Sequence, residues 1–258
     1  MKILLIGDIY SNEGRMMVEK YVPKLRDKYN INFIVANGEN IAHGNGINER
    51  YYHFLLDNNI NVITMGNHTW GNADIFNFID DAKALVRPLN YPEGTPGKGY
   101  VTIKYNALTI TVFQVLGRTF MNQSLDCPFK ATEKLLSEVK SDIYICDFHG
   151  EATSEKIAFG LYFDGRVQVM VGTHTHVQTN DLHLLPNGSC YMTDLGMTGS
   201  LDGVIGVEPK GIIKKFITCM PVRHNPMESG RKQLCGAIVE INDKTQKVTH
   251  YDVVNVVE

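Results

Sequence analysis

The sequence predicts an α/β protein, and three observations carry that prediction. Over the first eighty residues, short apolar runs alternate with amphipathic segments, which is the strand–helix pattern of a parallel sheet. A segment rich in proline and glycine, 85–99, then precedes two apolar runs that read as a hairpin. The last third of the chain alternates short apolar runs with turns, as antiparallel strands do. We therefore expect two sheets in one domain, 1–258, with the crossing between sheets near 85–99.

In the first half, strands are expected where β-branched and apolar residues run together, and helices where apolar residues recur every three or four positions. The predicted strands are 2–6, 32–36 and 61–65, and the predicted helices are 15–29, 49–58 and 72–82. Pro23 lies inside the first helix and predicts that it is kinked or divided. The glycine-rich segment 42–46 predicts an irregular loop.

The same criteria locate the elements of the second half. The predicted strands are 100–104, 108–115, 142–146 and 167–171, the predicted helices are 130–140 and 153–163, and four antiparallel strands follow at 182–185, 189–193, 234–241 and 247–254. The run 167–171 ends at Gly172 and leads into His174-Thr-His176.

Charge and cysteine content exclude several classes of partner. The formal net charge is −3 and no block of like charge occurs, so long nucleic acid and anionic membrane are not expected partners. The five cysteines are an odd number and widely spaced, which predicts reduced thiols. The first apolar run, 2–6, is too short for a signal segment or a membrane span, so we expect a cytoplasmic protein.

Five of the predicted strands end in residues that bind metals or in their neighbours. These endings are Asp8, Glu39-Asn40, Asn67-His68, His149, and His174 with His176. The carboxyl ends of strands are where open α/β sheets place their sites. If the backbone stays extended beyond 167–171, the two imidazoles of His174 and His176 point the same way.

The number and type of these donors predict two metal ions. Seven candidate ligands are more than one ion needs but suit two ions bridged by a carboxylate: Asp8, Glu39, Asn40, Asn67, His149, His174 and His176. Mixed nitrogen and oxygen donors favour Mn²⁺, Fe²⁺ or Zn²⁺ over Ca²⁺ or Mg²⁺. Two carboxylates leave such a centre net positive, so it should attract an anion such as a phosphodiester.

These motifs resemble those of the calcineurin-like metallophosphoesterases. The resemblance lies in Gly7-Asp8, Gly66-Asn67-His68, His149 and Gly172-Thr-His174-Thr-His176. Tyr10 stands where that superfamily has a histidine, and Gly38-Glu39-Asn40 stands where it has an aspartate. Both departures, together with 116–121 and 193–199, are typical of the YmdB-like branch, which the whole chain resembles.

The resemblance implies a four-layer α/β/β/α sandwich of two mixed sheets and a di-metal centre that often contains iron. It implies phosphodiesterase activity toward small diesters, 2′,3′-cyclic nucleotides foremost and 3′,5′-cyclic nucleotides as well, and self-association as a homo-oligomer. One ion would be held by Asp8, Glu39, Asn40 and His176, and the other by Glu39, Asn67, His149 and His174.

The expected reaction is attack on phosphorus by a hydroxide held between the two ions, with His68 protonating the departing ribose oxygen. Three further residues are candidates for contact with substrate. Arg118 would clamp a phosphate or else be a surface arginine, His43 would line the site, and Asp194 would face the substrate or else support a turn. Tyr10 would fill the space of the missing histidine without binding metal.

Two other functions fit the same residues. A regulatory protein could keep the metal fold and sense a cyclic nucleotide with little turnover, although such a sensor would not need a proton donor at His68. A phosphomonoesterase or protein phosphatase could use the same centre, because one site chemistry serves several reactions.

Overall fold

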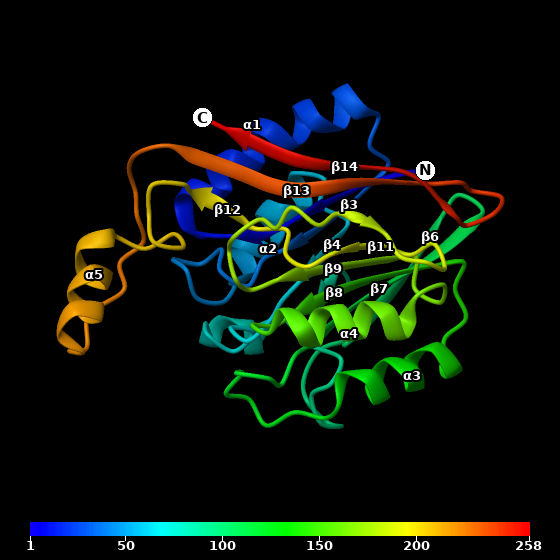
Figure 1. Cartoon of the computed structure of the whole chain (residues 1–258), viewed down its shortest axis with the longest axis horizontal. Helices are drawn as coiled ribbons and strands as arrows, with labels where there is room; N and C mark the ends of the chain where they lie inside the picture. The colour runs from blue at the N-terminus through cyan, green and yellow to red at the C-terminus, as the bar shows by residue number, and fades with distance from the viewer.

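The computed structural model describes residues 1–258 and has four layers, with two mixed sheets between two pairs of helices (Figure 1). The first sheet contains β1 (Lys2–Ile6), β2 (Asp8–Ile9), β3 (Phe33–Asn37), β4 (Val62–Thr64), β5 (Leu85–Val86), β12 (Met197–Ser200), β13 (Lys232–Ile241) and β14 (Val248–Val257). Its order is β2-β12-β13-β1-β3-β4-β5, with β14 paired to β13. The second sheet contains β6 (Tyr100–Tyr105), β7 (Leu108–Leu116), β8 (Ile143–His149), β9 (Val169–Thr173), β10 (His183–Leu184) and β11 (Cys190–Met192), in the order β10-β11-β9-β8-β7-β6.

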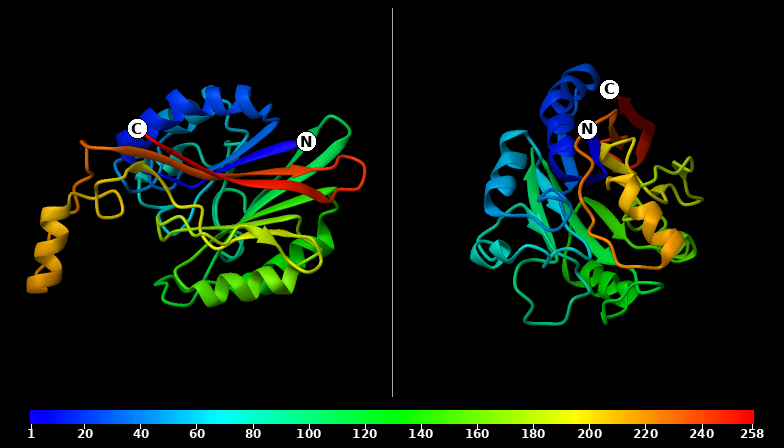
Figure 2. Two further views of the ribbon diagram at one scale, coloured as in Figure 1. Left: turned by 45° about the horizontal axis from the view of Figure 1, so that its top comes forward. Right: turned by 90° about the vertical axis from the view of Figure 1, so that its left-hand side faces the viewer.

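The helices cover the outer faces of both sheets. Helices α1 (Ser11–Tyr29) and α2 (Glu49–Asp57) pack on the first sheet, and α3 (Pro128–Glu138) and α4 (Thr153–Phe163) pack on the second. A fifth helix, α5 (Pro209–Thr218), projects from this body (Figure 2). The predicted four-layer sandwich of two mixed sheets is confirmed.

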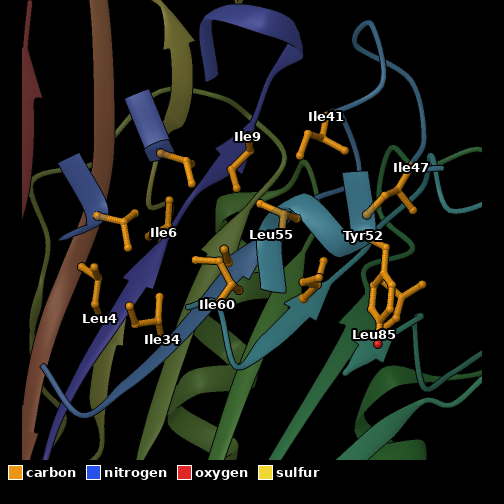
Figure 3. Packing of buried hydrophobic residues seen from close by; sticks show 14 of the residues in the cluster. Leu4, Ile6, Ile9, Ile34, Ile41, Ile47, Tyr52, Leu55, Ile60 and Leu85 are labelled. Carbon is orange, nitrogen blue, oxygen red and sulfur yellow. The ribbon is translucent and has the colours of Figure 1, made fainter. Parts of the chain in front are cut away.

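Alternation along β1 shows how one strand serves two cores. Leu4 and Ile6 face the helices and join Leu55 of α2 in the outer cluster (Figure 3). Ile3 and Leu5 face the other way, into the cluster between the two sheets. Because such a strand is buried on both faces, it reads as a continuous apolar run. Burial of each aliphatic side chain stabilises the fold by about 1.5–3 kcal/mol.

The predicted helix at 72–82 is wrong. Only a short 3-10 turn, η1 (Ala73–Asn77), forms there. Polar side chains bind neighbouring groups in place of a helix: Asn77 donates to Asp74, and Asp80 accepts the backbone N–H of Gly97. Asn and Asp compete with the helical backbone in this way.

Other expectations need smaller corrections. Strands β2, β5 and β12 and helix α5 lie outside the predicted elements, and β11 pairs parallel to β9 although an antiparallel strand was expected there. Helix α1 begins at Ser11 and runs through Pro23 without a division. The crossing near 85–99 is confirmed, because β6 and β7 form a hairpin in the second sheet.

Two sequence features have simple structural counterparts. All five cysteines are free, as predicted. No helix of the structure combines the length and the apolar character needed to cross a membrane.

Candidate metal centre

The seven predicted ligands come together where the carboxyl ends of strands from both sheets meet. The first sheet supplies Asp8, the first residue of β2, Glu39 and Asn40 after β3, and Asn67 after β4. The second sheet supplies His149 at the end of β8 and His174 and His176 after β9. The side chains form two adjoining groups that share Glu39.

The first group surrounds the Nε2 atom of His149. This nitrogen lies 2.8 Å from Asn67 Oδ1, 3.0 Å from His174 Nδ1 and 3.1 Å from Glu39 Oε1. The ligand atoms of Glu39, His149 and His174 all lie within 4.8 Å of one another. Three elements far apart in sequence therefore present donor atoms to one small volume.

A buried relay fixes which nitrogen of His149 faces that volume. The Thr173 hydroxyl donates to Asp147 Oδ1 at 2.6 Å, so toward His149 Nδ1, 2.8 Å away, it can only accept. Nδ1 therefore carries a proton, and in the neutral ring Nε2 keeps its lone pair. Asp147 is itself held by Thr64 and Asn37. Such outer partners orient metal-binding histidines.

The second group contains Asp8, Asn40 and His176. His176 Nε2 lies 3.2 Å from the Asn40 amide nitrogen and 3.8 Å from Asp8 Oδ1. Its other ring nitrogen, Nδ1, lies 3.0 Å from the Ile205 carbonyl oxygen and so donates to it. The Asn40 amide also donates to Glu39 Oε1 at 3.3 Å, which links the second group to the first.

Without cations the electrostatics of this cluster are strained. Burial raises the pKa of Asp8 to about 6. Burial opposes the charge of His149, but the carboxylates of Glu39, Asp8 and Asp147 outweigh it and raise the pKa of His149 to about 9. Burial and then the charge of His149 lower the pKa of His174 to about 3.

These observations test whether the residues suit divalent cations, and they do. Asp8 Oδ1 is buried and has no hydrogen-bond partner. The facing nitrogens of His149 and His174, 3.0 Å apart, need a cation or a proton between them. Buried carboxylates and imidazoles of this kind are ordinary ligands of Mn²⁺, Fe²⁺ and Zn²⁺.

His68 lies beside the ligands and differs from them in exposure. Its backbone N–H donates to Glu39 Oε2 at 2.8 Å, and its Nδ1 lies 2.7 Å from Asn40 Oδ1. The side chain is 41% exposed. Nδ1 is engaged by the ligand shell, and Nε2 has no protein hydrogen bond, so it is the nitrogen available to a bound molecule.

The structure places the remaining candidates differently from one another. Arg118 and His43 are exposed; the Arg118 side chain makes no protein hydrogen bond, and its backbone N–H donates to Glu155. Asp194 is not brought to the open face, since it is fully buried and paired with Lys156. The Tyr10 ring is buried and packs edge-on to His176, with centroids 5.7 Å apart.

Two supporting residues were missed although the sequence signals both. Asp147 precedes His149 by two positions in β8, so strand alternation puts both side chains on one face. Lys156 lies at helical spacing from Phe159, Gly160 and Phe163, the buried positions of α4. A charged residue on each of these buried faces could have been noticed.

The expectation of an extended backbone through the two histidines is wrong. Strand β9 ends at Thr173, and both residues have positive φ, 102° for His174 and 65° for His176. The imidazoles converge because the chain turns sharply there.

Gly66 allows Glu39 and His149 to approach β4. A Cβ atom at this position would lie 2.3 Å from Glu39 Oε2 and 2.7 Å from His149 Nε2. We expect Gly66→Ala to push both side chains aside and to lower metal affinity by about 10-fold or more, the size of effect seen when ligand supports are removed. Calorimetric titration with Mn²⁺ measures this.

The matched control is Gly211→Ala, because a Cβ at Gly211 in α5 meets nothing closer than 3.7 Å. Equal Mn²⁺ affinity in the Gly66→Ala and Gly211→Ala variants would show that this space is not needed by the ligands.

Comparison with known proteins gives close matches over nearly the whole chain. The chain is 51% identical over 249 residues to the 2′,3′-cyclic-nucleotide 2′-phosphodiesterase of Bacillus subtilis (strain 168), covering 96% of this chain and 94% of the relative. A crystal structure described as a novel phosphatase from Mycoplasma pneumoniae superposes with a TM-score of 0.96 at 34% identity, covering 100% of this chain and 93% of the other.

A more distant structure shows the fold alone. The NAD nucleotidase of Haemophilus influenzae has a TM-score of 0.62 at 13% identity, covering 99% of this chain and 55% of that one. The family model described as "YmdB-like protein" matches residues 4–254. With that match and the Bacillus relative, the chain belongs to the YmdB-like protein family.

Proposed function

We propose that the protein is a metal-dependent phosphodiesterase of small diesters, with 2′,3′-cyclic nucleotides as the first substrate class and 3′,5′-cyclic nucleotides as the second. The observation that carries the proposal is the convergence of seven metal-binding side chains from five strand ends, in a chain half identical to a 2′,3′-cyclic-nucleotide 2′-phosphodiesterase.

Two divalent ions are proposed. Asp8, Glu39, Asn40 and His176 would hold one, and Glu39, Asn67, His149 and His174 would hold the other. Bound ions would supply Lewis acidity toward the phosphate and would acidify the attacking water. Iron or manganese suits this donor set best, with zinc as the alternative.

The chain's own residues supply orientation and a proton. The Thr173–Asp147 relay keeps the lone pair of His149 directed into the cluster. His68, half exposed and bound to Asn40 through Nδ1, would present Nε2 to the leaving ribose oxygen and protonate it. Arg118 is exposed on the loop after β7, and we assign its free guanidinium to a phosphate oxygen.

A phosphomonoesterase is the second candidate, favoured by the description of the Mycoplasma pneumoniae structure as a phosphatase. The same donor cluster serves both reactions, and they differ in leaving group and in the charge of the phosphate. Comparison of a cyclic nucleotide with the matching nucleoside monophosphates separates them.

Removal of the metals should abolish turnover. After chelation and dialysis, we expect hydrolysis of a 2′,3′-cyclic nucleotide to fall to background, and Mn²⁺ or Fe²⁺ to restore it better than Mg²⁺ or Ca²⁺, because three imidazoles favour transition metals. Phosphate release and product chromatography measure this across cyclic nucleotides and monoesters. Equal recovery with Ca²⁺, or faster turnover of monoesters, would contradict the proposal.

A further inference from the structure

The turn that carries His174 and His176 has an unfavourable backbone conformation. Their φ angles of 102° and 65° lie in the region that residues other than glycine rarely adopt. Each such residue costs on the order of 1–3 kcal/mol and persists only where its surroundings enforce it. The conformation of this turn therefore needs an enforcing contact.

A buried ion pair binds the two peptide groups that flank His174. Lys156 Nζ donates to the Thr173 carbonyl oxygen at 2.8 Å, and Asp194 Oδ2 accepts the Thr175 N–H at 3.0 Å. Lys156 and Asp194 are themselves joined at 2.9 Å. Rotation about φ or ψ of His174 would turn one of these peptide groups away from its partner.

Neither member of the pair reaches the open face of the site. The Lys156 side chain is 1% exposed and that of Asp194 is 0% exposed. Asp194 is anchored on its far side by the N–H of Gly196, 2.9 Å from Oδ1. Opposed by burial, the Lys156 charge still lowers the pKa of Asp194, so the aspartate is held ionised.

Stability alone gives a weak reason for two buried charges. A buried pair pays a desolvation cost that its mutual attraction only partly repays, and well-packed apolar residues are often as stable. The contacts to Thr173 and Thr175 are what an apolar pair could not make.

We infer that Lys156 and Asp194 are positioning residues that hold the His174-Thr175-His176 turn in its metal-binding conformation. The inference rests on the proposed metal centre. The pair touches neither ion nor substrate and acts only through the two peptide groups beside His174.

The test is Mn²⁺ affinity of chelator-stripped protein, measured by calorimetry on the Lys156→Met/Asp194→Asn double variant. The double substitution removes both charges together, so no buried ion is left unpaired, and it removes the donor to Thr173. We expect a folded protein by circular dichroism, with Mn²⁺ affinity about 10- to 100-fold weaker, as for other partners of metal-binding histidines.

The matched control is Arg166→Met/Glu133→Gln, which removes an ion pair at the other end of α4, with N and O 2.9 Å apart. This control should bind Mn²⁺ like the wild type. Equal affinity in the wild type and the folded Lys156→Met/Asp194→Asn variant would overturn the inference. Absence of Mn²⁺ binding by the wild type would instead overturn the proposed metal centre.

If the double variant does not fold, Asp194→Glu gives the same answer. It keeps both charges but moves the carboxylate by one methylene, so it cannot meet Lys156 and the Thr175 N–H in the same geometry. Weaker Mn²⁺ binding with a wild-type unfolding midpoint supports positioning. Unchanged binding contradicts it.

Discussion

Replacement of Glu39 by glutamine should give the largest single loss. Glu39 is 1% exposed, and Oε1 lies 3.1 Å from His149 Nε2 while Oε2 accepts the backbone N–H of His68. The glutamine keeps the shape but removes the charge proposed to bridge both ions. Because bound metal contributes several kcal/mol to phosphate chemistry, we expect turnover to fall by about 10³-fold or more.

Metal content and turnover of Glu39→Gln are measured on the same preparation. The control is Glu133→Gln, which neutralises a surface carboxylate paired with Arg166 and should leave both quantities unchanged. Full metal occupancy together with normal turnover in the Glu39→Gln variant would remove Glu39 from the centre.

The second large effect is expected for His68→Ala. The backbone contact from residue 68 to Glu39 Oε2 survives this change, so the ligands should stay in place and both ions should be retained. Loss of a proton donor costs about 10² to 10⁴ in rate. We expect that loss on a 2′,3′-cyclic nucleotide, whose alkoxide leaving group needs a proton.

A p-nitrophenyl diester distinguishes this role from a structural one, because its leaving anion departs unprotonated. His68→Ala should therefore lose much less activity on that substrate. His53→Ala serves as the control, since His53 is an exposed histidine of α2. Equal losses on both substrates, or loss of metal, would return His68 to a structural role.

The sequence was informative where burial and polarity change together. Apolar runs buried on both faces predicted β1, β3, β8 and β9, and the polar residues directly after them located the cluster. Adjacency along the chain was enough here, because the ends of parallel strands meet at one edge of a sheet.

Features set by tertiary contacts were not predictable in the same way. Helical spacing over 72–82 lost to side-chain contacts such as that from Asp80 to the Gly97 N–H. The positive φ of His174 depends on Lys156 and Asp194, which lie 18 and 20 positions away by subtraction of their residue numbers. Strand β12 is short and pairs with residues far away in sequence, so its own residues carry little signal.

The central claim is that this cluster is a di-metal centre, and metal analysis of protein purified without chelators tests it most directly. Seven donors in two groups sharing Glu39 predict about two transition-metal ions per chain, both lost together with 2′,3′-cyclic nucleotide hydrolysis in the His174→Ala/His176→Ala variant. A wild-type protein that hydrolyses the nucleotide without bound metal, or a double variant that still binds two ions, would contradict the account.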